Sequence, residues 1–247
     1  MHTALITGSS SGYGLETARH FLSRGWNVVA TMRHPRPELL PSSERLRLMR
    51  LDVTDPESIA RCLDEAGPLD VLVNNAGIGA FGPFEAMPLA ALREVFETNT
   101  FGTMAMTHAA LPRFRAQGSG VIVNVTSSAT LAPMPLVAAY TASKMAIEGF
   151  TASLAFELEG LGIRAKLVEP GYCATTAFAS NTGARAGGDM PEAYAPFVQQ
   201  VFAAYAAPAE HTRETDVAEA VYRAATDTSG QLRFPAGPDA VALAVAA

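Results

Sequence analysis

The chain has 247 residues, of which 49% are hydrophobic and 17% are charged, and its formal net charge is −6. This length, without a Pro-, Gly- or Ser-rich linker, predicts a single domain (1–247) with one substantial core. The mild negative charge and the scattered basic residues argue against a nucleic-acid or anionic membrane partner.

The N-terminus lacks a basic stretch followed by an apolar one, as a secretory signal would have, so we expect a cytoplasmic protein. No apolar run approaches the ~20 residues that a bilayer-spanning helix needs. The cysteines, Cys62 and Cys173, are expected to be reduced structural thiols. Histidines and cysteines show no ligand-like spacing, so no metal site is predicted.

Strand-like apolar runs alternate with helical periodicity along the chain. Strands are predicted at 4–7, 27–31, 46–51, 71–73, 120–125 and 164–168, and helices at 15–22, 57–65, 89–115, 139–159 and 215–225. Because parallel strands need crossover connections, this alternation predicts an α/β fold with a doubly wound parallel sheet and helices on both faces. Ligands are then expected beyond the carboxyl ends of the strands.

A glycine-rich turn lies between the first predicted strand and the first predicted helix. Gly8 permits a tight turn, Gly12 lets the backbone approach a phosphate, and Gly14 lets the helix lie close to the strand. The segment could be a plain loop, but its place between strand and helix favours a pyrophosphate site facing open amides. The residues assigned to this site are Gly8, Ser10, Ser11, Gly12, Tyr13 and Gly14.

Tyr140 and Lys144 stand four residues apart inside a long helical pattern, on one helix face. A phenol with a pKa of about 10 is a poor acid or base near neutrality, and a fixed cation beside it favours the phenolate. An ordinary amphipathic pair is the alternative for this spacing taken alone.

These motifs occur in one order together with Asn74-Asn75-Ala76-Gly77, Asn99, Ser127 and Pro170-Gly171. In this the chain resembles the short-chain dehydrogenase/reductase family over residues 3–175. The segments 30–33 and 233–240 resemble its hydroxysteroid and retinol dehydrogenase-like members. The resemblance implies a seven-stranded Rossmann-like sheet.

The resemblance also implies a catalytic set. Ser127 would hydrogen-bond the substrate oxygen, and Tyr140 would exchange a proton with it while nicotinamide exchanges hydride with the carbon. Lys144 would lower the pKa of Tyr140 and bind the nicotinamide ribose, and Asn99 would anchor a water beside Lys144. Hydroxyl neighbours flank Ser127 on both sides, and a structural bend is the alternative for Asn99.

Further cofactor contacts follow from the same resemblance. Asp52 would meet the adenine amine, although it could instead cap the next helix. Small residues after the fourth strand would let the backbone lie against the ribose, and the segment after the sixth strand would pass the nicotinamide. The remaining residues assigned to the cofactor are Val53, Asn75, Ala76, Gly77, Pro170, Gly171 and Thr175.

The second predicted strand ends in Met32 and Arg33, where an NAD-binding relative would carry an acidic residue. A guanidinium can bind a 2′-phosphate in a forked geometry, so NADP(H) is preferred and NAD(H) stays possible. Arg33 could also be an ordinary exposed charge, and the glycine turn carries no basic residue.

A stretch at 177–211 with several aromatic residues is interpreted as a substrate lid. With Leu131, Met134, Leu136 and Val137 it favours a small hydrophobic ketone, aldehyde or alcohol as substrate, although these side chains could simply close the core. The resemblance implies a homodimer or homotetramer. A nucleotide-binding redox sensor without turnover is the alternative function, and the compact glycine turn disfavours sugar-nucleotide epimerases or dehydratases.

Overall fold

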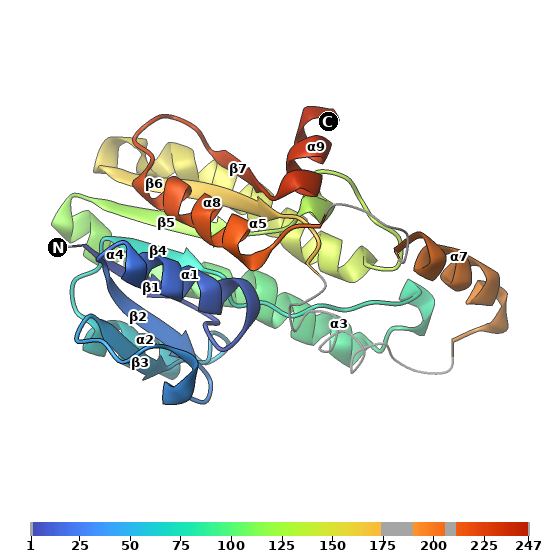
Figure 1. Cartoon of the computed structure of the whole chain (residues 1–247), viewed down its shortest axis with the longest axis horizontal. Coiled ribbons are helices and arrows are strands. Elements are labelled where there is room, and N and C mark those ends of the chain that lie inside the picture. The colour runs from blue at the N-terminus through green and yellow to red at the C-terminus, as the bar shows by residue number, and fades with distance from the viewer. Residues whose placement is uncertain (1, 174–189, 206–210, 247) are drawn as a thin grey trace.

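The computed structural model describes residues 2–173, 190–205 and 211–246 (Figure 1). Its centre is a parallel sheet of seven strands in the order β3-β2-β1-β4-β5-β6-β7. The chain winds outward from β1 to β3, returns to place β4 beside β1, and then winds outward in the opposite direction to β7. This single reversal makes a doubly wound sheet and confirms the predicted fold class. The strands are β1 (Thr3–Ile6), β2 (Asn27–Met32), β3 (Leu46–Arg50), β4 (Val71–Asn74), β5 (Gly120–Val125), β6 (Ile163–Pro170) and β7 (Arg233–Ala236).

Helices cover both faces of the sheet, and α1 and α8 lie side by side in front of it in Figure 1. The helix α7 lies at the end of the molecule farthest from α1. The α-helices are α1 (Gly12–Ser23), α2 (Pro56–Ala66), α3 (Leu89–Phe96), α4 (Gly102–Gln117), α5 (Ala138–Leu158), α7 (Ala195–Tyr205), α8 (Glu214–Thr226) and α9 (Pro238–Ala246).

Alternate side chains of each strand enter two different cores. On β1, Ala4 and Ile6 pack with α1 and α8, while Leu5 packs with α2, α4 and α5. Both sheet faces are therefore buried, which explains why the strands are continuous apolar runs rather than alternating ones. Among the described residues, no helix is long and apolar enough to cross a bilayer.

The six strands predicted from the sequence are confirmed within two residues at each end. The residue pattern did not predict β7, because Pro235 interrupts its short apolar run. Proline lacks an N–H and is tolerated at a sheet edge, and β7 is the edge strand beside β6. The segment predicted as helical at 89–115 is helical along its whole length, but it is not one regular α-helix: a π-helical segment, Glu97–Phe101, lies between α3 and α4.

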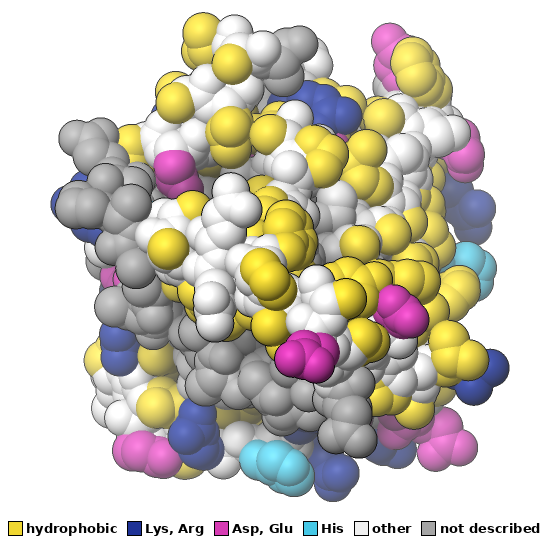
Figure 2. All heavy atoms as spheres, turned by 90° about the vertical axis from the view of Figure 1, so that its right-hand side faces the viewer, with side chains coloured by type: hydrophobic (Ala, Val, Ile, Leu, Met, Phe, Trp, Pro, Cys, Tyr) yellow, Lys and Arg dark blue, Asp and Glu magenta, His cyan; other side chains and the backbone are white. Residues whose placement is uncertain are grey.

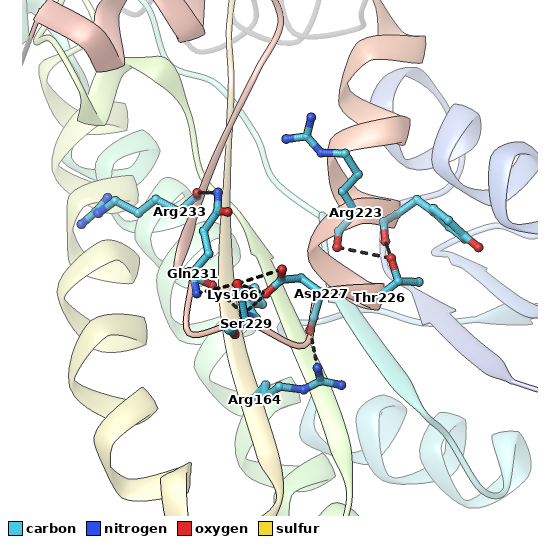
Figure 3. A network of polar contacts seen from close by, with 9 residues as sticks. Arg164, Lys166, Arg223, Thr226, Asp227, Ser229, Gln231 and Arg233 are labelled. Atoms are coloured by element: carbon cyan, nitrogen blue, oxygen red, sulfur yellow. Dashed lines mark hydrogen bonds and ion pairs between the residues drawn. The ribbon is translucent and has the colours of Figure 1, made fainter.

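The loop between α8 and β7 is fastened to β6 by one buried lysine (Figure 3). The Nζ atom of Lys166 donates to Oδ1 of Asp227 at 2.8 Å, to the Ser229 carbonyl at 3.0 Å and to the Gln231 carbonyl at 2.5 Å. All three ammonium donors are used, so a charge that is 2% exposed has a complete set of partners.

Candidate active site

A cavity of about 580 Å³ lies at the carboxyl ends of the strands, as the fold predicts. It runs from the glycine turn and the end of β2 to the start of α5. Most of the side chains and backbone segments predicted from the sequence line it. These are Gly8, Ser10, Ser11, Gly12, Tyr13, Arg33, Asp52, Val53, Asn75, Ala76, Gly77, Tyr140 and Lys144.

The glycine turn has the tight geometry that was predicted. Gly8 has φ +71° and Gly12 has φ +52°, a backbone region that favours glycine. A Cβ on Gly14 would lie 2.4 Å from the Gly8 carbonyl oxygen and 2.3 Å from Nδ2 of Asn75. The helix α1 can therefore approach β1 this closely only with glycine at position 14.

Thr7 and Asn75 hold the turn against the loop after β4. The Thr7 hydroxyl accepts hydrogen bonds from the backbone N–H groups of Asn75 at 3.0 Å and Ala76 at 2.9 Å. Asn75 Nδ2 donates in return to the carbonyl oxygens of Thr7 at 2.9 Å and Gly8 at 3.2 Å. The Asn75 side chain thus shapes the cavity wall, a role that sequence reasoning had not given to it or to Thr7.

Tyr13 connects the turn with the end of β6. Its phenol donates to the Gly171 carbonyl oxygen at 2.9 Å, and the Gly171 N–H donates to Ala236 of β7 at 3.0 Å. Pro170 and Gly171 lie behind the cavity wall rather than in its lining. Thr175, also predicted here, lies outside the described residues.

At the other end of the cavity, Arg33 is exposed beside Met32 and Asp52. Oδ1 of Asp52 accepts from the backbone N–H of Thr54 at 3.0 Å and from its hydroxyl at 2.8 Å. Burial opposes ionisation of Asp52, but these two bonds and the charges of Arg33 and Arg50 hold its pKa below the ordinary value. The cap of α2 is Asp55, so capping that helix is not the role of Asp52.

Tyr140 lines the cavity at the start of α5, and Ser127, which is not in the lining, lies beside Tyr140. Ser127 follows β5, and its side chain forms a hydrogen bond with the Tyr140 phenol. Burial raises the pKa of Tyr140 to about 12, and the bond to Ser127 lowers it only in part. The neighbouring lysine alone was expected to lower the pKa of Tyr140. The pKa is raised instead because the phenol is desolvated.

Lys144 is buried on the same face of α5 as Tyr140. Its Nζ donates to the Val125 carbonyl oxygen at 2.9 Å and lies 5.9 Å from the centre of the Tyr140 ring. Burial lowers the pKa of Lys144 to about 8, and the charge of Glu148 opposes that shift. The ammonium is therefore mostly charged at neutral pH but titrates close to it.

Asn99 lies in the π-helical segment and is fully buried behind Lys144. Its amide accepts from the Ile78 N–H at 2.8 Å and donates to the Ile78 carbonyl at 2.9 Å and to the Ser143 hydroxyl at 3.1 Å. Asparagine is unfavourable inside an α-helix, and here Asn99 marks the segment where the helix changes from α-helical to π-helical geometry. Such π-bulges are frequent at functional sites.

Comparison with known proteins identifies the family of the chain. The profile of the family described as "short chain dehydrogenase" matches residues 2–186. The chain belongs to the short-chain dehydrogenase family. It is an oxidoreductase of that family with a nucleotide-binding fold. Among the described residues, no group of His, Cys, Asp and Glu side chains could hold a metal ion.

Two relatives illustrate the similarity. An uncharacterised oxidoreductase of Bacillus subtilis is 35% identical over 95% of this chain and 88% of its own length. Retinol dehydrogenase 8 of Bos taurus is 42% identical over 70% of this chain, but the match spans only 59% of the retinol dehydrogenase.

Two solved structures share the fold over nearly the whole chain. A short-chain dehydrogenase from Streptomyces avermitilis has a TM-score of 0.81 and 32% identity, covering 99% of this chain and 91% of its own. A short-chain dehydrogenase from Burkholderia cenocepacia, solved in complex with NADP, has a TM-score of 0.76 and 27% identity, covering 100% and 93%.

Proposed function

We propose that this chain is an NADP(H)-dependent oxidoreductase that interconverts a hydrophobic ketone or aldehyde and its alcohol. The observation that carries the proposal is the Ser127–Tyr140 hydrogen bond, with Lys144 on the same helix face. This group stands at one end of a cavity whose other end is a glycine turn. A proton donor and a nucleotide cradle thus share one space, as a hydride-transfer reaction requires.

The residues present fit a dinucleotide. The cavity volume of about 580 Å³ falls within the usual range for ligand sites, roughly 300–1,000 Å³. The turn packs so closely against Asn75 and Ala76 that a side chain at Gly8 or Gly14 would clash with these residues and change the shape of the turn. Arg33 and Asp52 would face the adenosine, the amides after Ser11 the pyrophosphate, and Lys144 the nicotinamide ribose.

When bound, a reduced nicotinamide would supply the hydride that the carbonyl carbon accepts. Ser127 orients the carbonyl oxygen by hydrogen bonding, and Tyr140 donates its phenolic proton to that oxygen. The raised pKa of Tyr140 keeps this proton in place until the oxygen becomes basic. The Lys144 ammonium offsets the negative charge that develops on the phenol, and the protein backbone at Val125 fixes its position.

An apolar substrate is supported by the face of the molecule around α7. Figure 2 shows hydrophobic side chains on this side of the molecule. Two aromatic side chains of α7, Phe197 and Phe202, are 46% and 56% exposed. The rings of Phe202 and Phe81 are in contact at a tilted angle with their centres 5.5 Å apart, which connects α7 to the loop after β4. Exposed apolar side chains that gather on one face are typical of surfaces that bind apolar molecules.

Paired titrations with NADPH and NADH, followed by nicotinamide fluorescence, test the cofactor. Arg33→Ala should weaken NADPH binding by about ten-fold or more and leave NADH binding nearly unchanged, because a charged hydrogen bond to phosphate contributes roughly 1.5–3 kcal/mol. Arg61→Ala, an exposed arginine of α2, is the matched control. Tighter binding of NADH by the unaltered protein would contradict the NADP assignment.

Turnover is tested with a panel of bulky ketones and the preferred reduced cofactor. Tyr140→Phe should keep cofactor binding and lose nearly all reduction, since the proton donor is removed while the ring remains. Tyr222→Phe on α8 removes a hydroxyl remote from the cavity and should keep the rate. Ketone reduction by Tyr140→Phe at the rate of the unaltered protein would contradict the mechanism. Cofactor binding without turnover in the unaltered protein would favour the redox-sensor alternative.

A further inference from the structure

A buried carboxylate lies directly behind the catalytic side chains. Glu148 is 4% exposed and stands one helical turn after Lys144 on α5. Its Oε1 accepts hydrogen bonds from the hydroxyls of Thr126 at 2.5 Å and Thr130 at 3.2 Å. Thr126 and Thr130 lie on either side of Ser127, and the single proton of the Thr130 hydroxyl is shared between Glu148 and the nearer Ser127 carbonyl oxygen at 2.6 Å. The carboxylate therefore fastens the turn that presents Ser127.

One arginine connects this carboxylate with the end of β6. Nη1 of Arg233 donates to Oε2 of Glu148 and, at 2.6 Å, to Oε1 of Glu169. Glu169 is fully buried directly before Pro170, and its Oε2 has no hydrogen-bond partner among the described residues. Burial and the charge of Glu148 raise the pKa of Glu169, while Arg233 lowers it. Glu148, with three donors, is the better satisfied carboxylate of the two.

We propose that Glu148, held by Arg233, is a positioning residue for the reaction: it fixes the Ser127 turn and places a negative charge one helical turn behind Lys144. This inference rests on the proposed function and deepens it. Two effects follow. Ser127 keeps its distance to Tyr140, and Lys144 stays charged in an apolar setting that would otherwise remove its proton.

The charge of Lys144 depends on every ionisable group around it. On α5 these are Tyr140 and Glu148. From α3 and the π-helical segment, Glu94 and Glu97 line the same cavity, but both are exposed to solvent and therefore screened. On β5, the Lys144 ammonium donates a hydrogen bond to the Val125 carbonyl oxygen, which carries no charge. Glu148 is thus the buried anion among them, with Arg233 and Glu169 behind it.

Lysine composition allows a direct measurement. Lys144 and Lys166 are the only lysines of the chain. Protein made with lysine carrying ¹³C at the ε-carbon should give two NMR signals, and Lys144→Met assigns them. In Glu148→Gln the pH midpoint of Lys144 should fall by about one pH unit, because a charge at helical i,i+4 spacing is removed from a buried site. In Glu157→Gln, on the exposed face of the same helix, it should not move.

Kinetics then separate charge from geometry. For ketone reduction, Glu148→Gln should lower kcat about five-fold at pH 8 and less than two-fold at pH 6, with the ketone KM little changed. Thr130→Val removes the bridge between Ser127 and Glu148 without removing charge. It should lower kcat several-fold at every pH and leave the Lys144 midpoint unchanged.

An unchanged Lys144 midpoint in folded Glu148→Gln overturns the charge effect, and an unchanged kcat in Thr130→Val overturns the effect on Ser127. Should Glu148→Gln fail to fold, Glu148→Asp replaces it: the charge is kept, so the midpoint should stay while kcat falls, and a midpoint lowered by a full unit would count against the proposal. Because the NMR titration needs no turnover, absence of activity in the unaltered protein would refute the proposed function without deciding this one.

Discussion

The phenol of Tyr13 donates a 2.9 Å hydrogen bond to the carbonyl oxygen of Gly171, 158 residues further along the chain. The bond joins the glycine turn, where a pyrophosphate would lie, to the segment after β6. The bond therefore fastens Tyr13, which lines the cavity, to the segment directly behind the cavity wall. Burial raises the pKa of Tyr13, so the phenol keeps the proton that it donates.

Tyr13→Phe should weaken NADPH binding by about two- to ten-fold, since a hydrogen bond between neutral groups contributes roughly 0.5–1.5 kcal/mol and the buried Gly171 carbonyl loses its partner. Fluorescence titration measures the effect. Tyr222→Phe serves as control, because it removes a hydroxyl of the α1–α8 core. An affinity equal to that of the unaltered protein would show that the glycine turn is held in place without this bond.

The rate of ketone reduction should fall as the pH rises through about 8. Lys144 has a lowered pKa of about 8, so it is charged below this pH and loses its proton above it. Tyr140 titrates near 12 and keeps its proton throughout this range. Values of kcat at saturating ketone and cofactor between pH 6 and 10 give the midpoint. A rate that holds to pH 10 would mean that Lys144 keeps an ordinary lysine pKa.

Much of the fold could be predicted from sequence because its causes are local. The strands are apolar on both faces, so each appears as a continuous run, and the glycine turn follows the first of them. β7 could not be found in this way because its only support is its place at the sheet edge beside β6. The break between α3 and α4 depends on the buried amide of Asn99 contacting Ile78.

In the candidate site, as in the fold, the features with local causes could be predicted from the sequence. Spacing alone brings Tyr140 and Lys144 to one helix face, but it carries no information on burial, which decides the direction of the Tyr140 pKa. The bond between Glu148 and Arg233 spans 85 positions and lacks any short-range signal. Sequence reasoning therefore identified the residues that line the cavity better than the buried residues that hold them in place.

We propose that α4 and α5 form a self-association face. Met145 and Phe156, eleven residues apart on α5, point in one direction, and their exposed fractions are 50% and 81%. Phe101 before α4 is 55% exposed. Exposed apolar side chains at this spacing are typical of helix contacts between subunits.

Phe156→Glu should therefore convert an oligomer into a monomer, because a carboxylate would have to be buried unpaired at the contact. Light scattering on a size-exclusion column measures the mass. Val245→Glu, on the exposed side of α9, provides a control at a different apolar position. If the unaltered protein is a monomer, or if Phe156→Glu keeps the oligomer, this face is not the contact.

Lys166→Met should destabilise the protein by about 2–4 kcal/mol. The methionine keeps the apolar stem, but Asp227 loses its buried cation and the carbonyls of Ser229 and Gln231 lose their donor. At this chain length the expected fall in Tm is about 4–16 °C. Arg61→Met removes the exposed 3.8 Å pair with Glu57 and should leave Tm nearly unchanged. Equal Tm values for the two variants would mean that water replaces the lysine without cost, and that the α8–β7 loop is held by the packing of Phe234 and its neighbours in the core.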